Sequence, residues 1–142
     1  MTDSDPFTAF LSGYAAAVRA RDVTAFLSLY DPSLHVFDMW QTAPLAGLPA
    51  WRAMAEGWFG GLGDEVVVVT WRQAQSQVSG DLASGQAILN FAAQAPDGSV
   101  LRALDNRLSV TLRRGPDGWK VVHEHTSAPI EHGTMAAVLK LP

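Results

Sequence analysis

The sequence contains no cysteine, so it can form neither a disulfide framework nor a thiolate metal site. Charged residues make up only 17% of the 142 residues, and no run of one sign stands out. The formal net charge is −4. These features argue against nucleic acid and anionic membrane as general partners.

Long hydrophobic runs are also missing. The N-terminal residues 1–6 are acidic and lack the apolar core of a signal peptide, and no stretch approaches the length needed to cross a membrane. We therefore expect a cytoplasmic protein. A phosphate-binding loop, a dinucleotide-binding fingerprint and a nucleophile elbow are likewise absent, and no cofactor is expected.

What the sequence does contain is a hydrophobic content of 48% and a change of period along the chain. Helical spacing predicts a first helix that begins at residues 4–6 and two more over Val23–Leu29 and Pro49–Phe59. Strand-like runs follow, and we expect four long strands over Glu65–Val78, Gly85–Gln94, Ser99–Arg113 and Trp119–Ser127. This order predicts one α+β domain over residues 1–142, with helices on one face of an antiparallel sheet. The space between the helices and the sheet would form a small-molecule pocket.

An additional strand, Leu34–Trp40, contains the residue that draws most attention. The side-chain period of two places Leu34, Val36, Asp38 and Trp40 on one face. If that face is internal, the carboxylate must be paired, neutralised or used. We interpret Asp38 as a candidate catalytic base, with a structural ion pair as the alternative.

Several other side chains are candidates for the same site. Tyr14 could donate its hydroxyl or simply pack in the core. Arg107 could bind an oxyanion or pair with Asp38, Asp105 or Glu124. His123 and His125 share a strand face. A third metal ligand would have to come from elsewhere, so we expect no metal and favour a proton relay or an orienting partner for Asp38. His125 is preferred because it lies nearer the open end of its hairpin.

Aromatic residues could form the apolar part of a pocket. Most are expected in the core or in a dimer surface, but Trp40, Trp58 and Phe91 could line a cavity suited to a ring-shaped ligand.

Two segments resemble the nuclear transport factor 2-like, or SnoaL-like, superfamily of cone-shaped α+β domains. Residues 14–38 resemble the opening of ketosteroid isomerase without a gap, including a helix tyrosine and a strand aspartate at matching separation. Residues 106–110 and 117–129 are similar to the closing hairpin of SnoaL-like proteins and of the calcium/calmodulin-dependent kinase association domain. The resemblance implies a curved, mixed or antiparallel sheet wrapped around N-terminal helices, as in the cystatin-like roll.

The resemblance also implies a chemistry. The residue matching Asp38 is the proton-shuttling base of the isomerase, and the one matching Tyr14 donates to the oxyanion. A protonated carboxylic acid would fall near Asp105. Arg107, two residues on, departs from the isomerase pattern because a neighbouring guanidinium would keep Asp105 ionised.

The implied function is a cofactor-free isomerase or lyase acting on an apolar cyclic or carbonyl compound, in a homodimer. The same fold also includes non-catalytic ligand-binding or dimerisation modules, and epoxide hydrolases and dehydratases that use water chemistry. The Asp-x-Arg of residues 105–107 is similar to the water-activating site of limonene-type epoxide hydrolases.

Overall fold

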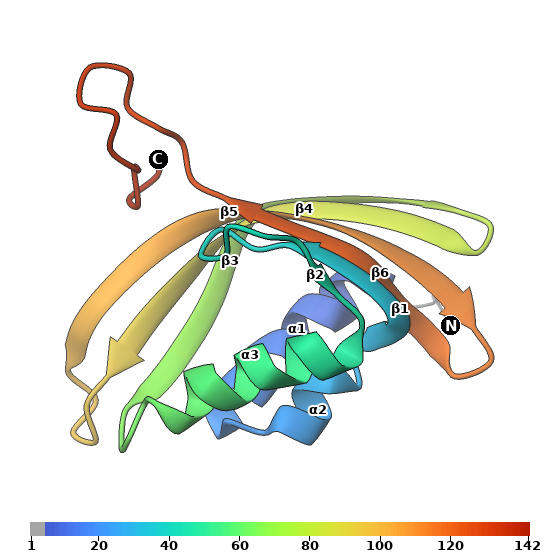
Figure 1. Cartoon of the computed structure of the whole chain (residues 1–142), viewed down its shortest axis with the longest axis horizontal. Coiled ribbons are helices and arrows are strands. Elements are labelled where there is room, and N and C mark those ends of the chain that lie inside the picture. Colours follow the sequence, from blue (N-terminus) through green and yellow to red (C-terminus); the bar gives the residue numbers. More distant parts are fainter. Residues whose placement is uncertain (1–4) are drawn as a thin grey trace.

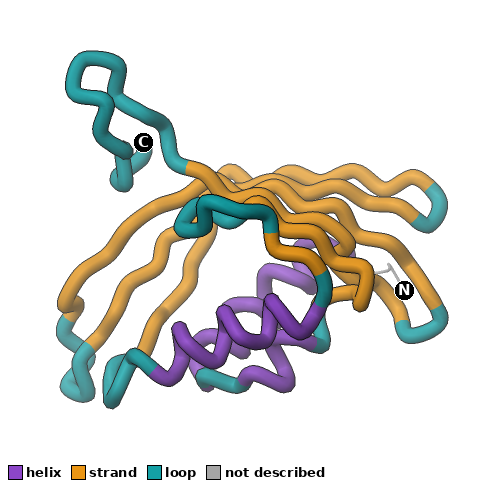
Figure 2. Tube along the Cα trace, in the orientation of Figure 1, coloured by secondary structure: helices purple, strands orange, loops and turns teal. Residues whose placement is uncertain are grey.

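The computed structural model describes residues 5–142. Three helices, α1 (Pro6–Ala20), α2 (Val23–Leu27) and α3 (Leu48–Gly60), lie on the concave side of one curved sheet (Figures 1 and 2). The sheet order is β2-β1-β6-β5-β4-β3, and its strands are β1 (Tyr30–Phe37), β2 (Leu45–Ala46), β3 (Val66–Ser79), β4 (Leu82–Gln94), β5 (Val100–Gly115) and β6 (Gly118–Ser127). The α+β class and the curved mixed sheet around the N-terminal helices are confirmed.

The sheet is mixed because of one pairing. β1 runs parallel to β6, whereas the other neighbouring strands are antiparallel. β3, β4 and β5 pair over most of their length as long hairpins, and they curve around the helices (Figure 1). This curvature leaves room between β3–β5 and α3, which is where the candidate site lies.

Local signals set the helix ends. Asp5 caps α1, since its Oδ2 accepts a hydrogen bond from the Thr8 N–H at 3.0 Å, and Pro6 occupies the first turn. The helix was expected to begin at residues 4–6, and of these Ser4 lies outside the described residues. Asp22 caps α2 in the same way through the Ala25 N–H.

The core lies between the helices and the concave face of the sheet. α1 buries an apolar stripe that runs from Phe7 to Val18. The rings of Phe26 and Tyr30 pack against this stripe, and Trp51 packs on those two rings. Gly85 of β4 lies against the Phe7 ring, where a Cβ atom would overlap the ring. The close approach of α1 to the sheet therefore requires a glycine at this position.

Some boundaries differ from those predicted. β1 begins earlier than expected, at Tyr30, and ends at Phe37, so Asp38 and Trp40 lie in the turn that follows. Residues 31–33, which precede the expected strand, are part of β1 and lie next to an irregularity in its pairing with β6. β2 was not predicted. Residues 128–142 form no helix, and the C-terminal segment has one isolated bridge, between Ile130 and Ala137.

Over residues 5–142, none of the helices combines the length and apolar character needed to cross a membrane.

Candidate functional site

A cavity of about 740 Å³ opens between α3 and the concave face of the sheet. This volume suits a small organic ligand. Its walls are mainly apolar and aromatic, and they include all three predicted pocket aromatics, Trp40, Trp58 and Phe91. Trp40 is 64% exposed, so it lies at the rim rather than inside. The polar groups in the lining are few: Tyr14, Asp38, Gln41, Arg102, Asn106, Glu124 and Thr126.

Asp38 lies in the wall of this cavity, just after β1. The Trp40 N–H donates to its Oδ2 at 3.1 Å, and the Thr126 hydroxyl also favours its charged form. Burial nevertheless raises the pKa of Asp38 above its ordinary value of 3.8. No ion pair to Asp38 is found among residues 5–142. The carboxylate is therefore free to accept a proton from a ligand.

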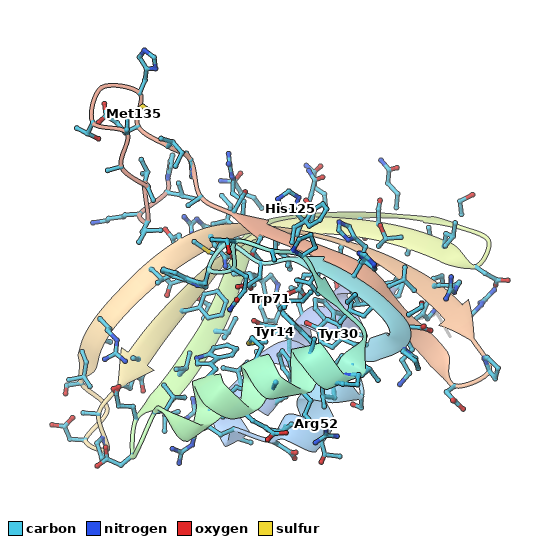
Figure 3. The ribbon with its side chains drawn as sticks, viewed as in Figure 1. Tyr14, Tyr30, Arg52, Trp71, His125 and Met135 are labelled. Carbon is cyan, nitrogen blue, oxygen red and sulfur yellow. The ribbon has the colours of Figure 1, made fainter. Side chains whose placement is uncertain are left out.

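Tyr14 reaches the same cavity from α1, and Figure 3 shows it between the helices and the sheet. Its ring packs against Phe26 and Phe91, and the residue is 7% exposed. Burial and then the charges of Glu124 and Asp38 hold the pKa of Tyr14 well above 10.0, so the phenol stays protonated as a donor. Within the described chain no hydrogen bond joins Tyr14 to Asp38; both groups remain available to a ligand.

Glu124 of β6 is the third titratable group of the cavity, and the sequence analysis did not assign it to the site. Its carboxyl is 2% exposed and accepts a hydrogen bond from the Tyr30 hydroxyl at 2.6 Å. Burial raises the pKa of Glu124 from 4.5 to about 7, opposed by the Tyr30 hydrogen bond and assisted by the charge of Asp38. At a pH near 7, Glu124 would therefore carry a proton in about half of the molecules.

Asn106 of β5 is a second cavity residue that was missed. It is 4% exposed, and its Nδ2 makes a weak hydrogen bond to the Met39 sulfur at 3.4 Å. Its Oδ1 is buried and has no hydrogen-bond partner among residues 5–142. A buried amide oxygen normally has a partner, so this one is suited to a hydroxyl or N–H of a ligand.

Arg102 is a cationic side chain in the lining, and none of the other described residues adds a second one there. Its guanidinium makes two hydrogen bonds to the Glu65 carboxylate, at 2.7 and 3.1 Å. Because this charge already has a partner, the cavity does not require an anionic ligand.

Asp105 and Arg107 do not belong to the cavity lining. Asn106 faces inward, so its two neighbours on β5 project to the opposite, convex face of the sheet. The expected pairing between Arg107 and Asp105 is wrong as well. The Arg107 Nε donates to the Ser127 hydroxyl at 3.2 Å, whereas Asp105 forms an ion pair with Arg72 of β3.

The Asp105 carboxylate holds the C-terminal segment, residues 128–142, against β5. It accepts hydrogen bonds from the Leu141 N–H at 2.8 Å and the Asn90 amide at 2.9 Å, and Arg72 also donates to the Leu141 carbonyl. The Asp105 N–H donates to the carbonyl of Leu139, a residue that lines the cavity. Asp105 thus supports one wall of the site from outside.

This arrangement predicts a loss of stability in acid. Burial alone would raise the pKa of Asp105, but the hydrogen bonds from Arg72, Leu141 and Asn90 lower it from 3.8 to about 2. The lowered pKa stabilises the fold above pH 3.8, and that contribution disappears as the pH falls through 2. We expect wild type to lose about 2 kcal/mol more than Asp105→Asn over this interval.

Urea unfolding at a series of pH values from 5 to 2 would measure the difference. Asp117→Asn, in the exposed turn between β5 and β6, is the matched control. If the free energy of unfolding changes with pH in the same way in wild type and Asp105→Asn, the stabilising role of ionised Asp105 would be contradicted.

The histidines are also on the convex face. The Phe37 ring lies 5.3 Å from the His123 ring and 5.4 Å from the His125 ring, and the His123 Nδ1 lies 2.9 Å from the His35 carbonyl oxygen. Figure 3 shows His125 on the side of the sheet away from Tyr14 and Tyr30. Neither imidazole lines the cavity, so neither can orient Asp38 directly. In the described part of the chain, no cluster of three metal-ligating side chains is found.

Comparisons with known proteins give the same fold. The chain is similar to a nuclear transport factor 2-like protein of unknown function from Pseudomonas putida KT2440, with 26% identity, a TM-score of 0.82 and coverage of 96% of this chain and 93% of that one. A nuclear transport factor 2-like protein with a cystatin-like fold from Novosphingobium aromaticivorans is 18% identical, with a TM-score of 0.75 and coverage of 92% and 84%.

A further similar structure is an uncharacterised protein with a cystatin-like fold from Caulobacter vibrioides. It is 15% identical, has a TM-score of 0.70 and covers 87% of each chain. A search of curated proteins gave no match. The family profile of the SnoaL-like domain matches residues 8–131, and the chain therefore belongs to the SnoaL-like domain family.

Proposed function

We propose that this protein binds an apolar, ring-shaped small molecule in the cavity and moves a proton on it. The observation that supports this most directly is the position of Asp38. This carboxylate forms no ion pair with any residue of 5–142, and it lies in a cavity whose other walls are mainly aromatic and aliphatic. Such perturbed acids concentrate at functional sites.

The reaction class follows from the groups that face the ligand. The Asp38 carboxylate, being partly desolvated, is a stronger base than an exposed aspartate. The Tyr14 hydroxyl is a neutral donor in the same cavity and can stabilise negative charge on an oxygen of the ligand. Together they suit proton abstraction from a carbon next to a carbonyl group, as in an isomerase or lyase. A non-catalytic ligand-binding module is the alternative.

Hydrogen–deuterium exchange separates the two possibilities. Cyclic ketones such as cyclohexenone, indanone and tetralone would be incubated with the protein in D₂O, and deuterium incorporation next to the carbonyl would be followed by mass spectrometry. We expect exchange faster than in buffer for at least one ring system. A ketone that raises the thermal midpoint without exchanging would identify a binding module instead.

We also propose a homodimer that pairs through the convex face of the sheet. The resemblance to proteins that pair in this way favours it, and so does Phe37, whose aromatic side chain is 47% exposed next to His123 and His125. Light scattering after gel filtration should give twice the chain mass for wild type and the chain mass for Phe37→Arg. A monomeric wild type would contradict the proposal.

A further inference from the structure

Glu124 of β6 and Asp38, which directly follows β1, line the same cavity. In the parallel pairing of β1 with β6, Val36 is opposite Glu124, and Phe37 is opposite His125. Val36 and Glu124 are both buried on the concave face, whereas Phe37 and His125 lie on the convex face. Asp38 is the first residue past the end of β1, and its carboxylate is close enough for its charge to act on Glu124.

The surroundings of Glu124 contain no compensating positive charge. Its neighbours are Tyr30 from β1, Tyr14 from α1 and Asp38, while Val110 lies opposite it on β5. Among residues 5–142, no lysine, arginine or histidine forms an ion pair with Glu124. An ionised carboxylate that is 2% exposed, with one hydroxyl donor, is costly. A negative charge at Asp38 further increases the free energy needed to ionise Glu124.

We infer that Asp38 and Glu124 form a carboxyl pair that shares a single exchangeable proton, with Glu124 as the acid and Asp38 as the base. The inference rests on the proposed function and extends it, since it assigns a further catalytic residue. It also narrows the ligand to one that presents an oxygen atom near Glu124 and an acidic C–H bond near Asp38.

The step is a balanced proton exchange. Asp38 forms an O–H bond to the proton of the C–H bond, whose electron pair becomes the new carbon–carbon double bond. The carbonyl π electrons move to oxygen, which receives the Glu124 proton. The product is a neutral enol, and the negative charge has moved from Asp38 to Glu124. When the ligand is an unsaturated ketone, Asp38 returns its proton to the far carbon of the conjugated dienol. The enol O–H proton goes back to Glu124 as the carbonyl bond re-forms, so both carboxyl groups regain their starting state. The isomerisation needs no oxidant or cofactor.

Tyr30 positions the acid. Its hydroxyl donates to the Glu124 Oε1 at 2.6 Å, so the proton of the neutral acid belongs on Oε2, the oxygen left for the ligand. The direction of the shifted pKa agrees with this arrangement, because burial and the charge of Asp38 both raise the pKa of Glu124 and only the Tyr30 hydrogen bond lowers it.

A titration without any ligand tests the pair. The chain has four glutamates, Glu56, Glu65, Glu124 and Glu131. Labelling their side-chain carboxyl carbons with ¹³C would therefore give four NMR signals, and the signal lost in Glu124→Gln identifies the residue. We expect a midpoint of about 7 for Glu124. The pKa values of Glu65 and Glu131 are lowered by hydrogen bonds from Arg102 and Thr134, so their signals should titrate in acid.

Two variants test the coupling. Asp38→Asn removes the neighbouring charge and should lower the Glu124 midpoint. Tyr30→Phe removes the donor and should raise it. Asp31→Asn, on the same strand but outside the cavity, should leave it unchanged. A Glu124 midpoint in the range of an exposed glutamate, or one that Asp38→Asn does not lower, would overturn the inference.

The two proposals fail separately. If Glu124 titrates as expected but no ketone exchanges deuterium in D₂O, the carboxyl pair is supported and the proposed reaction is contradicted. If exchange occurs, its rate in wild type should fall on the alkaline side as Glu124 ionises. Glu124→Gln should lack this alkaline limb, because a glutamine cannot release a proton. An alkaline limb that persists in Glu124→Gln would overturn the acid role.

Discussion

Exchange of deuterium into a bound ketone should fall roughly a hundred- to ten-thousand-fold when Asp38 is replaced by asparagine, the range typical for loss of a general base. The amide has nearly the shape of the carboxylate, and it can still accept from the Trp40 N–H that now lies 3.1 Å from Oδ2. It cannot take a proton from carbon. Mass spectrometry of the recovered ketone measures the loss directly, under conditions where wild type exchanges.

The same variant should still bind the ketone. Most of the cavity wall is apolar, and Trp58 and Phe91 are unchanged, so the shift in the thermal midpoint on adding the ketone should resemble that of wild type. Asp31→Asn is the matched control, because Asp31 is also on β1 and contacts Ser33 and Arg113 away from the cavity. Exchange in Asp38→Asn at the wild-type rate would remove Asp38 as the base.

The fold could be predicted from the sequence because its signals are local. The apolar stripe of α1, the long β-rich runs and the glycine-containing turns each determine one element, and their order determines the α+β class. Asp38 could be found for the same reason. A charge among large apolar residues at strand spacing is unusual, and Asp38 does line the cavity, although β1 ends one residue before it.

The histidines were placed on the wrong face because β6 does not keep a strict period of two. Thr111 pairs with His123 and Leu112 pairs with Val121, so Val122 is an extra residue. This bulge changes the phase of the strand, and both Val121 and Glu124 point inward. Nothing in the run of residues 119–127 indicates where the extra residue lies. The sequence therefore predicts His123 and His125, rather than Glu124, on the inward face of β6.

Asp105 was misplaced for a different reason. Residues 105–107 of β5 are all polar, so alternation cannot tell which of them faces the cavity. The inward residue is Asn106. Asp105 is buried all the same, because Arg72 and the C-terminal segment cover it, and such a contact between residues 33 to 36 positions apart cannot be deduced from local pattern.

The second large expected effect is a fall in the free energy of unfolding of wild type as the pH rises from 4.5 to about 7. The pKa of Glu124 is raised from 4.5 to about 7 in the folded protein, so the fold favours the protonated form. Its contribution is complete below pH 4.5 and is lost as the pH rises through 7. Each pKa unit is worth about 1.4 kcal/mol, and wild type should therefore lose about 3 kcal/mol over this interval on account of Glu124 alone.

Glu124→Gln should not show this loss. The glutamine oxygen can accept from the Tyr30 hydroxyl as Glu124 Oε1 does, and the amide has no charge to bury. The variant should thus gain about 3 kcal/mol over wild type between pH 4.5 and 8, measured by urea unfolding at each pH. Other titrating groups are present in both proteins, so the difference curve isolates Glu124 and its coupling to Asp38. Glu131→Gln, at an exposed position, should track wild type throughout. A flat difference between Glu124→Gln and wild type would mean that Glu124 is ionised in the folded protein, and the cavity would then contain two bases and no carboxylic acid.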